Sequence, residues 1–307
     1  MPEYFKLETK TEGLLLDCMA IRPKGEIVAV LQIVHGMSEY KERYLPLMEY
    51  LSQFGIFCHI ADMRGHGKSI LSENDLGYFY GDTMEETIND VLRLAEHIKE
   101  ENRDKPFFLM GHSMGSLIVR SFVKRHDDMV DRLVVSGSPS DNPVKTMGLS
   151  LVKFLTRFKG ERYISPLCEK LFTGGFNKAF EREGHKCAWL SVNEKNVEDY
   201  EADPLCGFPF TLNGYGVLMN ILTDVYSPNG WQMKNKAMPV WFASGENDPC
   251  MTNEKSFLAA VDSMKNAGYK NIDHTLYPDM RHEIFNETQR EIVYNDLKNF
   301  LTGGIEA

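Results

Sequence analysis

The sequence predicts an α/β fold built on one mostly parallel sheet, and three patterns along the chain support this prediction. Short, nearly continuous apolar runs, typical of strands buried on both faces, occur early and late in the chain. Segments with the apolar period of an amphipathic helix separate these runs. Residues 3–21 instead alternate apolar and polar residues, as an antiparallel hairpin does. Strands that alternate with helices imply right-handed βαβ units and a parallel sheet.

The first part of the chain supplies the hairpin and most of the alternating elements. The turn of the hairpin is expected at Glu12 and Gly13. The apolar runs predict strands over residues 27–34, 56–60, 107–110 and 133–135. The helical periods predict helices over residues 44–54, 84–98 and 113–123.

The same alternation returns near the C-terminus, after a long interruption. Strands are expected over 240–243 and 273–277, and helices over 253–267 and 288–301. Residues 140–232 contain helical segments, turn residues and many aromatic side chains, but no clear buried strand. We therefore expect a core made of residues 1–139 and 233–307, with residues 140–232 as a helical insertion into it.

Composition excludes several classes of protein. The chain has 307 residues, with 34 Lys and Arg against 44 Asp and Glu, and a net charge of −10. Nucleic-acid binding depends on clustered Lys and Arg, so a nucleic-acid partner is not expected. The N-terminus lacks an apolar signal region and no apolar run is long enough for a membrane span, which predicts a cytoplasmic protein without a transmembrane segment. Neither C-x-x-C nor H-E-x-x-H spacing occurs, so no metal site is expected.

A candidate nucleophile lies in the segment Gly111-His112-Ser113-Met114-Gly115, which contains the pattern G-x-S-x-G. The pattern alone is weak, but here an apolar strand ends at the first glycine and a helical period begins after the serine. Such a tight turn presents the serine hydroxyl to solvent. Because a serine hydroxyl needs a base to become nucleophilic, a histidine and an acid are expected elsewhere in the chain.

The base is expected late in the chain, since this arrangement orders its residues as serine, acid, histidine. His274 falls inside the predicted strand 273–277, whereas His282 follows that strand in a loop. Loops at the carboxyl ends of parallel strands carry catalytic groups, which favours His282 as the base. No cofactor is needed for such a reaction.

The acid is expected after the strand that ends near residue 243. The loop 244–249 offers Asp248, which we prefer, and Glu246 as the alternative; Asp279 is a third choice. Two backbone N–H groups should stabilise the oxyanion, and those of Met37 and Met114 are the candidates.

Taken together, these motifs resemble the serine α/β-hydrolase family, and within it the monoacylglycerol lipase and lysophospholipase branch. The resemblance is carried by His35-Gly36-Met37-Ser38-Glu39 with Arg43-Tyr44, Asp62 to Ser69, Gly111 to Gly115, Ser244 to Pro249 and His282-Glu283. It implies an α/β-hydrolase fold, a triad of Ser113, His282 and Asp248, and oxyanion donors at Met37 and Met114. It also implies a cap over the site at residues 140–232, and hydrolysis of acyl esters of glycerol or related small lipids.

The cap has no recognisable motif, so two interpretations of its residues stay open. Phe208, Phe210, Leu218 and Leu222 either line a tunnel for an acyl chain or form the core of the cap. The segment 147–159 mixes apolar residues with Lys153 and Arg157, and either contacts an anionic lipid surface peripherally or packs on the protein itself.

Two other functions are compatible with the sequence. An aminopeptidase, an amidase or a thioesterase would use the same triad, and a peptidase would need a carboxylate in the cap such as Glu194, Glu198 or Glu201. A non-catalytic ligand-binding protein on the same scaffold is the other possibility. It would have no need of a serine, a histidine and an acid at matching positions, which makes it the weaker hypothesis.

Overall fold

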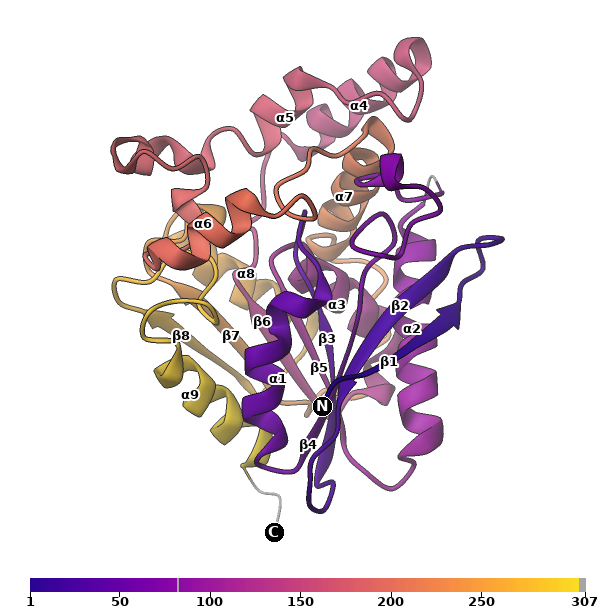
Figure 1. Cartoon of the computed structure of the whole chain (residues 1–307), viewed down its shortest axis with the longest axis vertical. Coiled ribbons are helices and arrows are strands. Elements are labelled where there is room, and N and C mark those ends of the chain that lie inside the picture. The colour runs from indigo at the N-terminus through magenta and orange to yellow at the C-terminus, as the bar shows by residue number, and fades with distance from the viewer. Residues whose placement is uncertain (82, 304–307) are drawn as a thin grey trace.

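The computed structural model describes residues 1–81 and 83–303, and its strands form one eight-stranded sheet (Figure 1). The strands are β1 (Glu3–Glu8), β2 (Leu15–Ile21), β3 (Ala29–Val34), β4 (Ile56–Ala61), β5 (Phe107–His112), β6 (Arg132–Ser136), β7 (Val240–Gly245) and β8 (Ile272–Tyr277). Their order across the sheet is β1-β2-β4-β3-β5-β6-β7-β8. β1 pairs antiparallel with β2, and β2 with β4, whereas every later pair is parallel.

Helices cover both faces of the sheet. Successive side chains of a strand point to opposite faces, so each central strand contributes to the core on both sides. Val30 and Val34 of β3 belong to the core shared with α2 (Met84–Glu101), α3 (Met114–His126) and α8 (Glu254–Ala267). Leu31 and Ile33 of the same strand face α1 (Leu45–Ser52) and α9 (Arg290–Thr302). The runs that the sequence shows as wholly apolar are therefore buried on two sides, as parallel strands require.

The chain between β6 and β7 forms the cap, whose helices lie at one end of the sheet in Figure 1. They are α4 (Lys145–Lys159), α5 (Pro166–Phe172), α6 (Glu194–Ala202) and α7 (Leu212–Val225), with short 3₁₀ segments η4 (Phe176–Glu183) and η5 (Ala188–Leu190). Residues 140–232 add no strand to the sheet; their one β-bridge joins Ile164 to Thr211. Short 3₁₀ segments elsewhere are η1 (Lys41–Tyr44), η2 (Glu73–Asp75), η3 (Asp127–Met129) and η6 (Pro249–Met251).

The predicted fold class is confirmed, and each predicted strand and helix has an observed counterpart. The inserted segment is not a separate layer. Its helix α7 packs against α3, and Val217 and Ile221 of α7 belong to the same hydrophobic core as α2, α3 and α8. The cap is thereby fixed to the rest of the molecule along α7. Within the described residues, every helix is too short or too polar to cross a lipid bilayer.

Candidate active site

Ser113 is the single residue between β5 and α3, and its backbone is left-handed (φ 54°, ψ −120°). This conformation costs a non-glycine residue about 1–3 kcal/mol, and such strain is typical of functional turns. The flanking glycines make the turn sterically feasible. A Cβ on Gly111 would lie 2.3 Å from the Gly115 carbonyl oxygen, and one on Gly115 would lie 2.1 Å from that of Val34. The strand–turn–helix geometry expected from the sequence is present.

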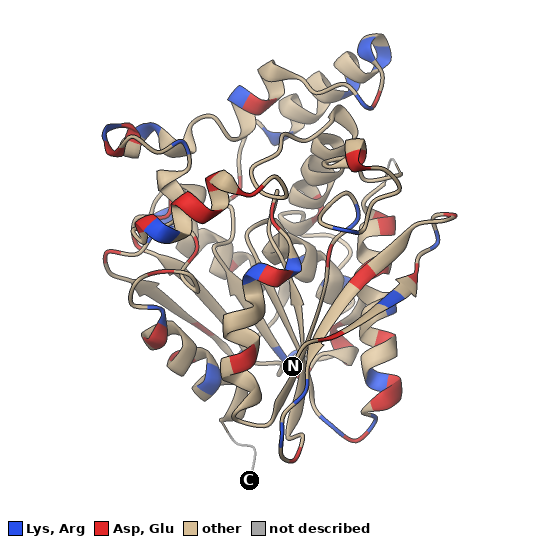
Figure 2. Cartoon of the chain, in the orientation of Figure 1, with Lys and Arg blue, Asp and Glu red and all other residues tan. Residues whose placement is uncertain are grey.

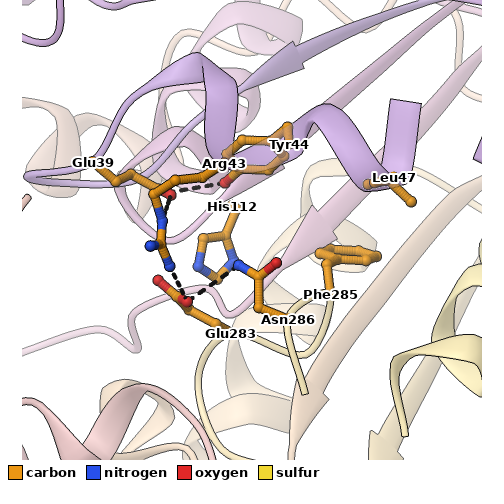
Figure 3. A pocket seen from close by; sticks show the side chains of 8 residues that line it. All are labelled: Glu39, Arg43, Tyr44, Leu47, His112, Glu283, Phe285 and Asn286. Carbon is orange, nitrogen blue, oxygen red and sulfur yellow. Dashed lines mark hydrogen bonds and ion pairs between the residues drawn. The ribbon is translucent and has the colours of Figure 1, made fainter. Parts of the chain in front are cut away.

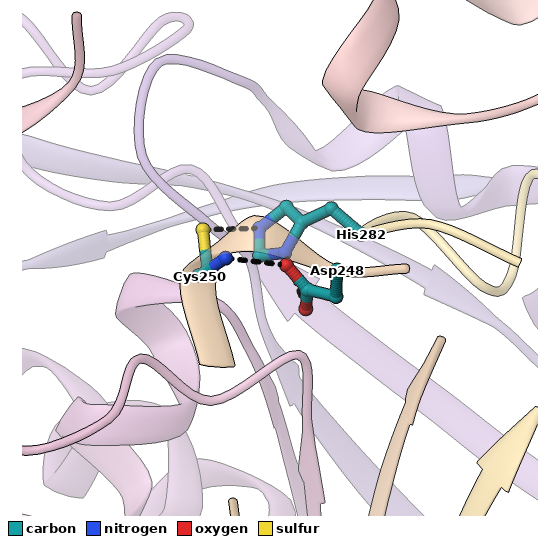
Figure 4. Close-up of side chains that lie close together, drawn as sticks. All are labelled: Asp248, Cys250 and His282. Atoms are coloured by element: carbon teal, nitrogen blue, oxygen red, sulfur yellow. Dashed lines mark hydrogen bonds and ion pairs between the residues drawn. The ribbon is translucent and has the colours of Figure 1, made fainter. Parts of the chain in front are cut away.

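Two loops at the carboxyl ends of β7 and β8 bring His282 and Asp248 together (Figure 4). His282 Nδ1 lies 2.9 Å from Asp248 Oδ2, and both side chains are buried. The Ser244 hydroxyl donates to the same oxygen at 2.9 Å, and the Cys250 N–H donates to Asp248 Oδ1 at 2.8 Å. These donors fix the orientation of the Asp248 carboxylate, and the carboxylate can then fix the orientation of the His282 imidazole.

The surroundings of His282 favour its protonated form. Burial by itself lowers the pKa of this imidazole, but the adjacent Asp248 carboxylate outweighs burial, and the pKa lies well above its ordinary value of 6.5. The rings of His112 and Trp189 lie next to it, tilted by 47° and 39°, with centroids 4.7 and 4.9 Å away. A neighbouring carboxylate stabilises an imidazolium, which is the species that a general base becomes.

The alternatives considered from sequence lie elsewhere. Glu246 and Asp279 have exposed side chains, and Asp279 occupies a left-handed turn (φ 60°). His274 is an exposed residue within β8. The structure therefore brings Asp248, rather than Glu246 or Asp279, into contact with His282.

The turn that carries Met37 lies directly against Ser113. A Cβ on the preceding Gly36 would lie 3.1 Å from Ser113 Cβ. Met114 is the first residue of α3, where backbone N–H groups have no partner within the helix and the helix dipole favours negative charge. Met37, Met114 and Ser113 all line the same cavity.

Glu39, Arg43 and Glu283 form a largely buried group of charged side chains to which the sequence analysis gave no role (Figure 3). The Glu39 carboxylate accepts from the Gly36 N–H at 2.5 Å and from the Tyr44 hydroxyl at 2.9 Å. Arg43 lies between Glu39 and Glu283, with Nη2 2.5 Å from Glu283 Oε2. Burial and the nearby Glu283 raise the pKa of Glu39 to about 7, although Arg43 opposes the shift. The group joins the Met37 turn to the residue next to His282.

The cap also holds the loop of His282. Arg281 pairs with the Glu183 carboxylate through two contacts of 2.9 and 2.6 Å, and donates to the Ala188 carbonyl at 2.6 Å. The Glu283 N–H donates to the Leu190 carbonyl at 2.7 Å. The residues on both sides of His282 are thus bonded to cap segment 183–190, which no local sequence pattern indicates.

A cavity of about 1310 Å³ lies over Ser113 and His282 and is lined largely by the cap. Phe208, Leu218 and Leu222 line it, which is where an acyl site would need them. Phe210 does not line the cavity: its side chain is fully buried and packs against His66, Phe79 and Tyr215, as the alternative of a cap core expects. Phe208 and Phe210 are two residues apart in a non-helical segment, and residue type alone does not indicate which of the two faces the cavity.

The carboxylates that a peptidase would use, Glu194, Glu198 and Glu201, are not among the residues that line the cavity.

Comparisons with known proteins agree with this geometry. Residues 25–289 match the family described as serine aminopeptidase, S33. The chain is 24% identical over 274 residues to phospholipase YtpA of Bacillus subtilis, covering 89% of this chain and 95% of the relative. It is 23% identical over 283 residues to a monoacylglycerol lipase of Mycolicibacterium smegmatis, covering 91% and 88%.

A solved structure shows the same fold over nearly the whole chain. It is a thermostable carboxyl esterase from Bacillus coagulans in complex with glycerol, with a TM-score of 0.92, 21% identity and 99% of both chains covered. The family match extends from before β3 to after β8 and so includes the whole candidate site. The chain belongs to the serine aminopeptidase S33 family of α/β-hydrolases and is a serine ester hydrolase of the lipase and esterase type.

Proposed function

We propose that this hydrolase cleaves acyl esters of glycerol or a related small lipid, with Ser113, His282 and Asp248 as its triad. The observation that carries this proposal is the large cavity directly over Ser113, whose lining includes the apolar residues Leu151, Phe172, Leu218, Met219 and Leu222. Apolar walls bind an acyl chain, while a few polar groups at the base of a cavity orient the reacting bond. The relatives named phospholipase and monoacylglycerol lipase support the same substrate class.

In the proposed reaction the Ser113 hydroxyl attacks the ester carbonyl while His282 Nε2 takes its proton. Asp248 accepts from Nδ1 and stabilises the resulting imidazolium. The N–H groups of Met37 and Met114 stabilise the oxyanion of the tetrahedral intermediate. His282 then returns the proton to the departing alcohol. Water attacks the acyl-enzyme in the second half of the cycle, with His282 again as base, and releases the fatty acid.

A substrate panel tests this proposal against the peptidase, amidase and thioesterase alternatives. We expect hydrolysis of p-nitrophenyl esters and monoacylglycerols, and weaker turnover of aminoacyl anilides and thioesters. Lysophospholipids test how large a head group the site accepts. Preferential cleavage of aminoacyl anilides would overturn the lipid-ester assignment while leaving the serine hydrolase class intact.

Acyl preference should depend on the cavity wall formed by α7. Each buried CH₂ contributes about 0.8 kcal/mol, so kcat/KM should rise about fourfold per added methylene until the cavity is filled. Leu218→Trp narrows the cavity and should shift the optimum to shorter p-nitrophenyl esters. Leu167→Trp, at an exposed position on α5 outside the lining, is the matched control and should keep the wild-type optimum. An equal response to chain length in both variants would contradict the role of Leu218.

We further propose that α4 and α5 contact a lipid surface peripherally. Large apolar side chains of these helices face solvent, with exposed fractions of 67% for Met147, 61% for Phe154, 67% for Phe158 and 60% for Leu171. Lys153 and Arg157 lie on α4 among them. An apolar face flanked by cations is what an anionic bilayer surface binds.

Charge reversal separates this contact from catalysis. Each basic residue near an anionic membrane contributes about 1 kcal/mol, so Lys153→Glu/Arg157→Glu should weaken binding to phosphatidylserine-containing vesicles by more than about tenfold. Turnover of a short soluble ester should stay at the wild-type level. The control pair Lys24→Glu/Lys265→Glu makes the same change in net charge at exposed sites on the core and should bind vesicles nearly normally. Equal vesicle binding by both double variants would exclude this surface.

A further inference from the structure

A thiol lies beside the nitrogen of His282 that faces away from Asp248. Cys250 Sγ is 3.9 Å from His282 Nε2, while Nδ1 of the same ring bonds to Asp248 (Figure 4). Ligand atoms of these three buried residues all lie within 4.8 Å of one another. The proposed ester hydrolysis gives the thiol no part, so its position calls for a separate explanation.

The position of the thiol is set by the same turn that sets the acid. Asp248 precedes the short η6 segment, and its Oδ1 accepts the Cys250 N–H at 2.8 Å. Its Oδ2 accepts from the imidazole. One carboxylate therefore fixes both the backbone that carries Sγ and the ring that carries Nε2, so the two atoms are held in relation to each other.

We propose that Cys250 Sγ and His282 Nε2 form an inhibitory binding site for a soft divalent cation such as Zn²⁺. Zn²⁺ bonds to sulfur at about 2.3 Å and to imidazole nitrogen at about 2.0–2.1 Å. A tetrahedral angle between those bonds places the two ligand atoms about 3.5 Å apart. The observed 3.9 Å is close to this separation and needs only a small side-chain adjustment.

The neighbouring groups complete the requirements of such a site. A metal-binding histidine commonly donates its other ring N–H to a carboxylate, and Asp248 is in that position. Cys250 and His282 both line the large cavity, which gives the cation a route of entry and leaves room for water as further ligands. When the Zn–S bond forms, the thiol proton leaves to solvent, and the chemistry needs no oxidant.

The consequence for activity rests on the proposed function of His282 as base. With Zn²⁺ on Nε2, that nitrogen has no lone pair to accept the Ser113 proton, so ester hydrolysis stops. Mg²⁺ and Ca²⁺ prefer oxygen ligands and should not inhibit.

Binding is measured first, without turnover. Co²⁺ is added to the Ser113→Ala protein as a spectroscopic probe, and we expect a cobalt–thiolate charge-transfer band. The band should disappear in Ser113→Ala/Cys250→Ser and in Ser113→Ala/Cys250→Ala. Cys187 lines the same cavity, so Ser113→Ala/Cys187→Ser is the matched control and should keep the band. A band that survives loss of Cys250, or no band at all, would overturn the site.

Inhibition is measured second, with a short soluble ester in buffer free of thiols and chelators. Zn²⁺ should inhibit the wild type and Cys187→Ser equally, and EDTA should restore both. Loss of even an outer partner of a metal site costs about 10–100-fold in affinity, so Cys250→Ser should need at least about tenfold more Zn²⁺, relative to its own uninhibited rate. A Cys250-dependent cobalt band without inhibition would show that the cation binds the thiol and leaves His282 Nε2 free, which would overturn the inhibitory site; failure of the triad mechanism is detected separately by Ser113→Ala. Equal sensitivity of wild type and Cys250→Ser would overturn the inhibitory mechanism.

Discussion

Replacing Ser113 by alanine is expected to lower ester hydrolysis by about six orders of magnitude, leaving only the catalysis that binding and the oxyanion donors supply. In the proposed mechanism the serine hydroxyl forms the acyl-enzyme, and the left-handed turn between β5 and α3 places Ser113 at the cavity. Alanine keeps the Cβ and the strained backbone, so the melting temperature should stay near that of the wild type. The comparison is made from kcat/KM with a p-nitrophenyl ester.

A chemical label tests the same assignment independently. A fluorophosphonate should modify Ser113, and the modified peptide is located by mass spectrometry. Ser256 also lines the cavity, so Ser256→Ala is the matched control and should keep both activity and labelling. An adduct on a serine other than Ser113, or full activity in Ser113→Ala, would remove Ser113 from the mechanism.

The fold was predictable because a strand that is buried on both faces consists almost entirely of apolar residues, and such runs are visible in the sequence. The exact ends of the strands were harder to predict. β5 and β7 continue past their apolar runs to His112 and Gly245, since parallel pairing with Ser136 and Tyr277 uses backbone groups and needs no apolar side chain. The helix expected from Ser113 begins one residue later because the backbone of Ser113 is left-handed. These boundaries depend on backbone hydrogen bonding and backbone conformation, which residue type predicts poorly.

The candidate site divides in the same way. Ser113, Asp248 and His282 could be proposed from their order and from their places after strands, because the sheet topology brings those strand ends to one edge. The partners that hold the site could not. Arg43 bonds to Glu283, which lies 240 residues away in the sequence, and Arg281 bonds to cap residue Glu183. Contacts of this kind follow from tertiary packing, and neither periodicity nor motif spacing marks them.

Asp248→Asn should lower kcat by about four orders of magnitude, which is the cost of the equivalent change in the serine protease template. The surrounding donors explain why the amide cannot substitute. The Cys250 N–H occupies Oδ1, so the amide oxygen of asparagine is held there and its NH₂ group faces His282 Nδ1. An NH₂ donor at that point forces the imidazole to carry its proton on Nε2, the atom that must accept from Ser113.

Two measurements distinguish this mechanism from a general loss of structure. Glu246→Gln makes the same carboxylate-to-amide change two residues away, at an exposed position, and should retain nearly full activity. The pH profile gives the second test: the Asp248 charge raises the pKa of His282, so the acid limb of kcat/KM should move to lower pH in Asp248→Asn. The neutral base would then persist at lower pH while the maximal rate falls, a combination that unfolding cannot produce. If Glu246→Gln is instead the disabling change, the acid is Glu246, and the contact between Asp248 and His282 is structural.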